Sequence, residues 1–474
     1  MRSDEYTAYD ALGLAELVEA GEVAAGEVLD AGLAAIDARN PELNAVVSRC
    51  DDAARAEVER GLPAGPFRGV PYLIKDLNAH VAGLPTTQGV RLFADQVAEV
   101  DSEFVARLRR VGMVIVGKTN TPGFGSSTST EPGLFGPCRN PWNLDHVAGG
   151  SSGGAASAVA GGMVPAAHAT DGGGSIRIPA SCCGLFGLKV TRGRVTHAPY
   201  AGEGWNGMSV GHAVTRSVRD SAAILDATCA PFPGDPYAAP APARPYLDEV
   251  AIEPGRLRVA LVDRQPATGI EPEPEVRTGL DAAARLLEEL GHHVELVSWP
   301  ELAMAPAAIL GVVSPTHIAS AVDRRLEALG RELRDDDLDG WIHAVVGRGR
   351  AVTGEEYVEA VAAMHAAGRA VAAWMADYDV VLTPTMAITP PRLGILDPNT
   401  GSMADALSYL GAMSGFLSIA NITGQPAMSV PLHRSSDGLP VGIHFLGRFG
   451  DEGTLFRLAA QLERAAPWTS LAPT

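Results

Sequence analysis

Two serine-bearing glycine clusters stand close together in the middle of the chain. The first is Gly-Gly-Ser-Ser-Gly-Gly over residues 149–154, and the second is Asp-Gly-Gly-Gly-Ser-Ile-Arg over residues 171–177. Glycine lets the backbone reach positive φ angles and lets a ligand or another segment approach closely. Residues 155–165 between them are mostly small and apolar, which favours a helix buried on all sides. The pattern predicts an active-site core in which backbone N–H groups and serine hydroxyls converge.

Ser175 has the sequence surroundings expected of a nucleophile. A hydroxyl nucleophile needs a base to take its proton, and it needs donors that hold the oxyanion formed by its attack. The backbone N–H groups of Gly172, Gly173, Gly174 and Ser175 can form such a nest, because no Cβ obstructs the substrate there. We expect Asp171 to brace this loop through hydrogen bonds between its side chain and the backbone.

Two residues are candidates for the base. His168 stands seven residues before Ser175, near a predicted strand end, and Lys75 ends the apolar run 70–74. That run is typical of a central strand in an α/β sheet. Burial lowers the pKa of a lysine, and the neutral amine can then accept a proton. Lys75 would still need a relay to reach Ser175, and the serines of 149–154 offer one because a hydroxyl donates and accepts at once.

Structural roles are the alternative for the same residues. Lys75 can instead extend its amine to water or pair with Asp76, and residues 149–154 taken alone are compatible with a flexible linker. No G-x-S-x-G elbow surrounds Ser175, which disfavours a Ser-His-Asp hydrolase. We predict neither a phosphate-binding loop nor a metal site, and His292-His293 is the nearest approach to a ligand cluster. No cofactor is expected.

The net charge, apolar segments and cysteines of the chain disfavour several classes of protein. The chain has 474 residues and a formal net charge of −19, which disfavours a nucleic acid partner because such binding rests on basic contacts to phosphate. The N-terminus lacks an apolar signal segment, and no apolar run is long enough to span a membrane. The cysteines match no zinc spacing and indicate buried thiols in a reducing, cytoplasmic compartment. They are Cys50, Cys138, Cys182, Cys183 and Cys229.

Strands alternate with helices along most of the chain, which predicts an α/β layered fold. Strands are predicted from Asn44 and at 70–74, 113–116, 187–190, 259–262, 293–296, 379–385, 426–431 and 441–445, and helices at 7–40 (two), 52–61, 101–112, 217–225, 275–291 and 452–464. Residues 230–256 are rich in proline and predict a surface loop. Residues 301–378 are predicted to be mostly helical and to cap the substrate pocket. The apolar segment Leu407–Ala420 is expected to be buried, and the whole chain, 1–474, to form a single domain.

Longer stretches around the candidate residues resemble the signature of the amidase signature family. The likeness runs through 149–154, 171–180 and 183–189. Shorter matches are Gly69-Val70-Pro71, Lys75-Asp76, Gly117–Pro122, Arg139–Asn143, Gly424–Ala427 and Gly438–Gly442. The resemblance covers nearly the whole chain and is weakest over 230–375. It implies an α/β amidase signature fold, in which helices cover both faces of a large mixed β-sheet.

The resemblance also implies a Ser-cisSer-Lys mechanism. Ser175 matches the nucleophile that forms the acyl-enzyme, Ser151 matches the relay serine that follows a cis peptide bond, and Lys75 matches the base. The oxyanion hole matches Gly172, Gly173, Gly174 and Ser175. Gly125 stands where the family contacts the acyl group, and Arg177 is expected to be structural.

One position departs from the family pattern. The family often has a bulkier residue where this chain has Gly172. We therefore expect the entrance beside the oxyanion loop to be roomier or more mobile than usual.

The substrate is the least determined property. The overall likeness is to bacterial amidases of the 6-aminohexanoate cyclic-dimer hydrolase, aryl acylamidase and urethanase type, which implies a small amide or carbamate (urethane) substrate. The main alternative is the glutaminase component of a glutamyl-tRNA(Gln) amidotransferase, which hydrolyses glutamine within a complex. A third alternative is a catalytically inactive scaffold. The presence of Lys75, Ser151 and Ser175 together disfavours it. We expect a homodimer and no membrane partner.

Overall fold

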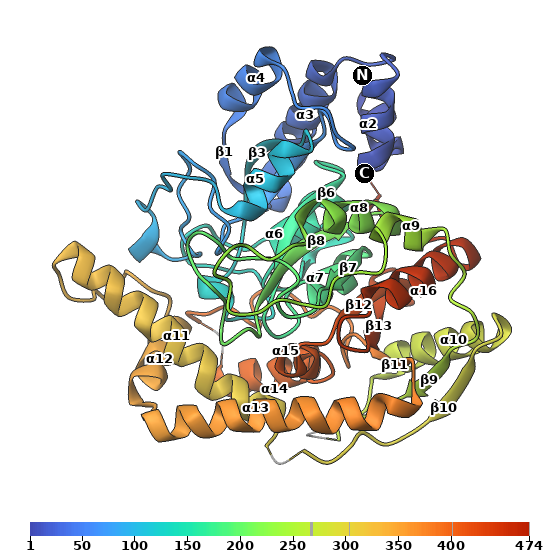
Figure 1. The fold of residues 1–474 in the computed structure, drawn as a ribbon. Helices are drawn as coiled ribbons and strands as arrows, with labels where there is room; N and C mark the ends of the chain where they lie inside the picture. Colours follow the sequence, from blue (N-terminus) through green and yellow to red (C-terminus); the bar gives the residue numbers. More distant parts are fainter. Residues whose placement is uncertain (266–268, 303, 401, 474) are drawn as a thin grey trace.

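The chain is built around one large β-sheet (Figure 1). The structure is a computed structural model that describes residues 1–265, 269–302, 304–400 and 402–473, without the side chain of Met403. Its strands are β1 Val46–Arg49, β2 Pro71–Lys75, β3 Val114–Thr119, β4 Arg139–Asn140, β5 Asn143–Val147, β6 Ala166–Asp171, β7 Phe186–Lys189, β8 Val210–Thr215, β9 Arg258–Leu261, β10 His293–Leu296, β11 Val380–Pro384, β12 Ala427–Arg434 and β13 Pro440–Gly447. In the described chain the main sheet has the order β1-β3-β2-β6-β8-β7-β12-β13-β11-β9-β10, and β4 pairs with β5 apart from it.

The sheet is mixed, as the family resemblance implies. Strands β3, β2 and β6 run parallel, and so do β11, β9 and β10. The pairings from β6 through β8, β7, β12 and β13 to β11 are antiparallel, and β1 joins β3 antiparallel at one edge. Nearly every residue of the central strands is buried, because helices cover the sheet on both faces.

Helices occupy both faces of the sheet (Figure 1). Their bounds are α1 Ser3–Ala8, α2 Ala11–Glu19, α3 Ala25–Leu43, α4 Asp51–Arg60, α5 Glu103–Arg110, α6 Gly153–Ala160, α7 Arg177–Cys183, α8 Val218–Thr228, α9 Tyr246–Val250, α10 Pro274–Glu289, α11 Pro306–Leu329, α12 Gly340–Ala351, α13 Gly354–Trp374, α14 Met403–Ser414, α15 Ser418–Thr423 and α16 Glu452–Ala465, with short 3-10 turns η1 Arg91–Phe93, η2 Gly123–Gly125 and η3 Met375–Asp377. Helices α5, α8, α10 and α16 share one apolar cluster with the sheet, and α6 and α7 share another.

Strand alternation decides on which face each candidate base lies. In β2, Ile74 packs in the α5 cluster and Leu73 in the α6 cluster, so alternation directs Lys75 toward α6. The ring of His168, in the middle of β6, packs against Phe104 of α5. The two candidates therefore lie on opposite faces, and the expected place of His168 at a strand end was wrong.

The helix between the glycine clusters is shorter than its apolar composition suggests. We expected a helix over 155–165, but α6 begins at Gly153 and ends at Ala160. Gly162 has a φ of 77° and Pro165 follows, and neither residue continues a helix. Every residue of α6 is buried, as the small side chains predicted.

The proline-rich segment 230–256 is not a loop throughout. Helix α9 begins at Tyr246, and its first N–H groups donate to the carboxylate of Asp226, at 2.7 Å for Tyr246. The ring of Tyr246 is buried against Phe456 of α16. This tertiary contact, rather than local composition, creates the helix.

Most of the segment 301–378 is helical, with α12 and α13 each packed on α11; residue 303 lies outside the described residues. The expected burial of Leu407–Ala420 holds only for its second half. Leu407 is 54% exposed, because α14 packs through one side only, while Leu417 and Ala420 are buried.

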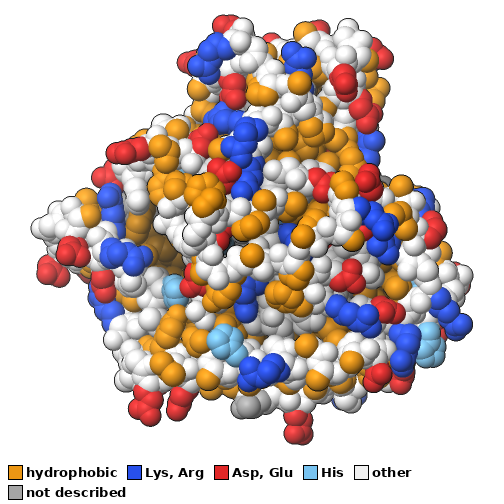
Figure 2. All heavy atoms as spheres, viewed as in Figure 1, with side chains coloured by type: hydrophobic (Ala, Val, Ile, Leu, Met, Phe, Trp, Pro, Cys, Tyr) orange, Lys and Arg blue, Asp and Glu red, His pale blue; other side chains and the backbone are white. Residues whose placement is uncertain are grey.

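One face of the molecule is drawn with all its atoms in Figure 2. Acidic and basic side chains are interspersed with hydrophobic ones, and the surface is hollowed near the α11–α12 region. The acidic excess of the chain is therefore not gathered into one patch on this face.

Candidate active site

Lys75 lies at the centre of a buried cluster of hydroxyl groups. Its Nζ is 2.7 Å from Ser151 Oγ, 2.9 Å from Ser152 Oγ and 2.9 Å from Thr170 Oγ1. The lysine is fully buried and forms no ion pair with a described residue. Burial lowers the pKa of Lys75 well below that of an ordinary lysine, although the charge of Asp171 raises it in part. The site thus favours a neutral amine surrounded by hydroxyls.

Ser151 is held at the N-terminal end of α6 by a closely packed backbone. The peptide bond between Gly150 and Ser151 is cis. Thr121 Oγ1 donates to the carbonyl oxygen of Ser151 at 3.0 Å. A methyl group on Gly150 would lie 2.7 Å from the carbonyl oxygen of Ser127, so this position has room only for glycine.

A second threonine closes the first glycine cluster into a loop. Thr130 Oγ1 donates to the carbonyl oxygen of Gly149 at 2.9 Å and accepts the N–H of Gly153 at 3.1 Å. A methyl group on Gly153 would collide with this hydroxyl at 2.5 Å. The glycines of 149–154 therefore serve close packing, which a flexible linker would not require.

The expected brace by Asp171 is confirmed. Its Oδ1 accepts the N–H of Gly174 at 2.7 Å, and its Oδ2 accepts the N–H of Ile176 at 3.1 Å. Arg177 forms a buried ion pair with the same carboxylate, with Nη2 2.9 Å from Oδ1. Burial alone would raise the pKa of Asp171, but Arg177 holds it well below its usual range. The second glycine cluster is therefore tied to a permanent negative charge.

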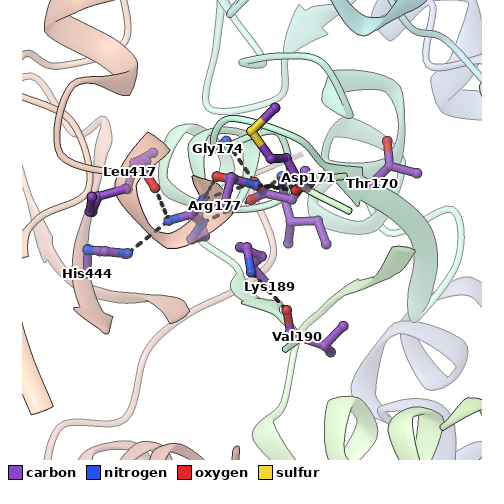
Figure 3. A network of polar contacts seen from close by, with 12 residues as sticks. Thr170, Asp171, Gly174, Arg177, Lys189, Val190, Leu417 and His444 are labelled. Carbon is purple, nitrogen blue, oxygen red and sulfur yellow. Dashed lines mark hydrogen bonds and ion pairs between the residues drawn. The ribbon is translucent and has the colours of Figure 1, made fainter. Parts of the chain in front are cut away.

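Arg177 is fully buried, and it lies between Asp171 on one side and Leu417 and His444 on the other (Figure 3). Besides Asp171, its guanidinium contacts the carbonyl oxygen of Leu417 at 3.0 Å and Nε2 of His444 at 3.0 Å. It also donates to Oδ1 of Asn421 at 2.8 Å. These partners come from three separate segments, so the arginine joins the serine loop to α15 and β13.

The four N–H groups predicted to form the nest are not equivalent. That of Gly174 is taken by Asp171. Those of Gly172, Gly173 and Ser175 donate to no described residue. Ser175 is partly exposed, and its hydroxyl has no hydrogen-bond partner in the described chain. Three amides and one hydroxyl without a partner in the described chain thus lie within four consecutive residues, of which Gly173 and Ser175 are partly exposed.

The extra room expected beside Gly172 is filled. A methyl group on Gly172 would lie 2.7 Å from Cζ3 of Trp205. The indole therefore occupies the volume that a bulkier residue would take. Trp205 has a φ of 52° and Asn206 a φ of 56°, so the segment reaches this position in a left-handed conformation that non-glycine residues rarely adopt.

Gly125 adjoins the relay position, and a cavity opens beside it. A methyl group on Gly125 would lie 2.9 Å from Ser151 Oγ. The cavity has a volume of about 240 Å³ and is lined from three segments, 122–131, 339–342 and 396–410. We call it the α12–α14 cavity, because the start of α12 and the inner side of α14 form two of its walls. Of the described part of 301–378, only residues 339–342 line it.

Several residues of the site had no clear sequence signal. Thr121 follows the buried strand β3, and Thr170 lies within the buried strand β6. Only the contact of Thr121 with Ser151 and that of Thr170 with Lys75 reveal their roles. His168 Nδ1 accepts the backbone N–H of Lys75 at 3.3 Å, and His168 forms no hydrogen bond with Ser175 among the described residues. It supports β2 rather than the hydroxyl cluster.

Two stretches of the sequence match the residue patterns of phosphate-binding loops, but their conformation in this protein is different. Residues 112–119 read G-x-x-x-x-G-K-T, yet 114–119 are the buried strand β3. Residues 202–207 read G-x-G-x-x-G and precede β8 without opening a helix. Neither has the loop-to-helix geometry that cradles phosphate.

The described residues contain neither a candidate membrane-spanning helix nor a candidate metal-binding cluster. No helix there combines the length and hydropathy that crossing a bilayer requires. No group of three or more His, Cys, Asp or Glu side chains there is arranged to hold a metal ion.

Comparison with known proteins finds likeness over nearly the full chain. A family model described as Amidase matches residues 27–456. The 6-aminohexanoate-cyclic-dimer hydrolase of Paenarthrobacter ureafaciens is 38% identical over 482 residues, covering 98% of this chain and 96% of that protein. A solved 6-aminohexanoate cyclic dimer hydrolase complexed with substrate has a TM-score of 0.93 at 37% identity, with 98% of both chains covered. A bacterial aryl acylamidase of the amidase signature family has a TM-score of 0.87 at 28% identity, covering 97% of this chain and 96% of that one.

Proposed function

The chain belongs to the amidase signature family and is a hydrolase that acts on amides, and we propose that it works through an acyl-enzyme on Ser175, with Ser151 as proton relay and Lys75 as base. The observation that carries the proposal is the 2.7 Å contact between Lys75 Nζ and Ser151 Oγ in a fully buried cluster. A neutral amine there can accept a proton, whereas an ion-paired ammonium cannot.

Hydrogen-bond counting supports the direction of proton transfer. A neutral amine has two N–H donors and one lone pair. The hydroxyl of Ser152 donates to the carbonyl oxygen of Thr170 at 3.3 Å, so its oxygen accepts one N–H of Lys75. The hydroxyl oxygen of Thr170 accepts the other. The lone pair of Lys75 is then left for the hydroxyl of Ser151, whose oxygen can accept the proton of Ser175.

The reaction follows from this arrangement. Lys75 takes the proton of Ser151 as Ser151 takes that of Ser175, and Ser175 Oγ bonds to the carbonyl carbon. The free amides of Gly172, Gly173 and Ser175 stabilise the oxyanion. The C–N bond then breaks as the proton returns through Ser151 to the leaving nitrogen. Water attacks the ester along the same proton path and frees Ser175.

We propose aryl amides, cyclic oligoamides and carbamates as the substrates to test. Apolar side chains surround the oxyanion loop: Trp205 lies beside Gly172, Leu310 beside Gly173 and Leu417 beside Gly174. An apolar group next to the scissile carbonyl would bury surface against them. A carbamate presents the same carbonyl–nitrogen bond.

Covalent labelling tests the nucleophile. A fluorophosphonate probe should label the folded protein at Ser175, read by peptide mass spectrometry, because the probe mimics the tetrahedral intermediate. The Ser175→Ala variant should remain unlabelled, and heat-denatured protein serves as the control for nonspecific reaction. Labelling at another serine would overturn the assignment. An unlabelled but folded wild type would support an inactive scaffold.

A hydrolysis panel tests the substrate class. The purified chain alone should be given an aryl acylamide, an aryl carbamate, a cyclic amide dimer and glutamine. We expect turnover of at least one of the first three. Glutamine turnover that needs added companion proteins, with no activity on the others, would favour an amidotransferase component instead.

The remaining expectations concern the setting of the enzyme. All five cysteines are free thiols, which supports our proposal that the enzyme works in a reducing cytoplasm. A homodimer stays a prediction, which sedimentation of the purified chain would check.

A further inference from the structure

The α12–α14 cavity adjoins the proposed catalytic serines. Its wall includes Ser126 and Ser127. Ser126 follows Gly125, where a methyl group would touch Ser151 Oγ, and the carbonyl oxygen of Ser127 lies 2.7 Å from a methyl group placed on Gly150. The cavity, of about 240 Å³, is therefore lined by segments that also pack against the backbone and hydroxyl of Ser151, the proposed relay.

The charge of the cavity wall is entirely negative. Glu131, Asp339 and Asp397 line it, and no described lining residue is a lysine, arginine or histidine. None of the three carboxylates forms an ion pair with a described residue. A cavity for neutral apolar groups gains nothing from carboxylates in its wall. A carboxylate loses hydration when a ligand covers it, and an apolar ligand offers no interaction in return.

Neutral donors hold each carboxylate in place. Glu131, which is 8% exposed, accepts the hydroxyl of Ser129 at 2.7 Å and the N–H of Gly394 at 2.8 Å. Asp397 accepts the backbone N–H of Asn399 at 2.8 Å. Asp339 accepts the backbone N–H of Gly133 at 3.2 Å. The acids are thus fixed in position while their charge stays uncompensated.

A nearby cation would stabilise the ionised form of the Glu131 carboxyl. Burial raises the pKa of Glu131, and the nearby charge of Asp397 raises it further. A positive group between these carboxylates would have the opposite effect, since opposite charges favour each other's ionised form. The indole of Trp341 also lines the cavity, with Nε1 donating to the carbonyl oxygen of Ser126 at 2.7 Å. Carboxylates beside an aromatic ring are the groups that bind organic ammonium ions.

We propose that the α12–α14 cavity binds a protonated amine, so that this enzyme prefers amides carrying an alkylammonium group a short chain away from the scissile bond. The preference for such substrates rests on the proposed function, whereas the binding of the cation does not.

Binding to an inactive variant tests the cation site separately from catalysis. Isothermal titration of full-length Ser175→Ala with n-hexylammonium and with hexanol, at neutral pH, compares a cation with a neutral molecule of the same length. We expect the ammonium to bind about tenfold more tightly, as for a charge-assisted contact. The difference should vanish in a variant that adds Glu131→Gln, Asp339→Asn and Asp397→Asn. Equal affinity of the two compounds, or a difference that survives the triple change, would overturn the proposal.

The matched control is Asp336→Asn. Asp336 precedes Asp339 by three residues in the sequence, is exposed and does not line the cavity. It should leave the preference for the ammonium intact. Thermal unfolding of each variant verifies that it is folded. If the triple variant is unstable, Asp397→Asn alone should lower the preference by at least about threefold.

The substrate preference is tested with two para-nitroanilides of equal length, one ending in an ammonium (aminohexanoyl) and one in a methyl group (heptanoyl). Wild type should give a higher kcat/KM for the first, and Asp397→Asn should lower the ratio while Asp336→Asn does not. Hydrolysis of both with a ratio near one would sink the substrate preference and leave the acyl-enzyme intact. Hydrolysis of neither would count against the proposed function, and the titration would then decide the cation site alone.

Discussion

Lys75 and Lys118 are two fully buried lysines on adjacent strands of the same sheet, and their surroundings differ. Strands β2 and β3 pair so that Ile74 faces Lys118 and Lys75 faces Thr119. Lys118 Nζ lies 3.4 Å from Asp76 Oδ1 and donates to the carbonyl oxygen of Ala79 at 2.9 Å. Among the described residues, Lys75 Nζ has only hydroxyl partners at hydrogen-bond distance.

This difference in surroundings distinguishes a lysine with a structural role from a lysine that can act as a base. Burial lowers the pKa of both, but the adjacent charge of Asp76 opposes this effect at Lys118. A neighbouring carboxylate favours the charged ammonium of a buried lysine, which is the form that cannot take a proton. A buried amine beside hydroxyls is the form that can. The sequence alternative for Lys75, a pair with Asp76, is the arrangement that Lys118 has instead.

The largest effect should come from Lys75→Met. We expect kcat/KM to fall by about a thousandfold or more, because the proton of Ser175 loses its acceptor. The fold should persist, because methionine fills much of the same volume without a charge to desolvate. Steady-state kinetics and circular dichroism check the two parts. Activity within tenfold of wild type would break the distinction between the two lysines.

Lys118→Met should lower the stability of the fold and leave the activity nearly unchanged. The buried carboxylate of Asp76 would lose its cation, and the free energy of unfolding should fall by about 3 kcal/mol. Denaturant titration measures this, and kcat per folded molecule should stay close to that of wild type. Adding Asp76→Asn removes the unpaired charge and should restore part of the loss. A single variant as stable as wild type would show that the ion pair is not structural.

The pH dependence should report Lys75 and not Lys118. Because Lys75 must be neutral to act, kcat/KM should fall about tenfold per pH unit as the pH drops below its pKa. Burial places that pKa well below the value of an ordinary lysine, so the acid limb should appear well below the range of free lysine. Lys118→Met should retain the limb. A limb at the ordinary lysine pKa would contradict the role of burial.

A smaller effect is expected from the hydroxyls that take the two N–H groups of Lys75. Ser152→Ala and Thr170→Val should each lower kcat about tenfold with little change in KM, since one lost hydrogen bond of about 1.4 kcal/mol disorients the amine. Ser157→Ala is the matched control, because Ser157 lies in α6, directly after the segment that holds Ser152, and donates instead to the carbonyl oxygen of Arg139. Equal loss in all three variants would indicate a packing effect.

The elements carrying the chemistry were predictable because their signals are local. The apolar run 70–74 ends in Lys75 and became β2, and Asp171 braces the next loop through residues three and five positions away. Strand β8 gave no comparable signal, since Gly211 and His212 interrupt its apolar pattern. It is a strand because β6 and β7 pair with it on both sides.

The sequence by itself determined the two serine–glycine clusters, the lysine at a buried strand end and the family they indicate. Only the tertiary structure decided that Trp205 fills the space beside Gly172 and that three carboxylates face one cavity. The physical reason is the separation along the sequence between the residues that interact. Strand ends and tight loops follow from neighbours a few residues apart, whereas these contacts join segments up to hundreds of residues apart, whose packing no local pattern encodes.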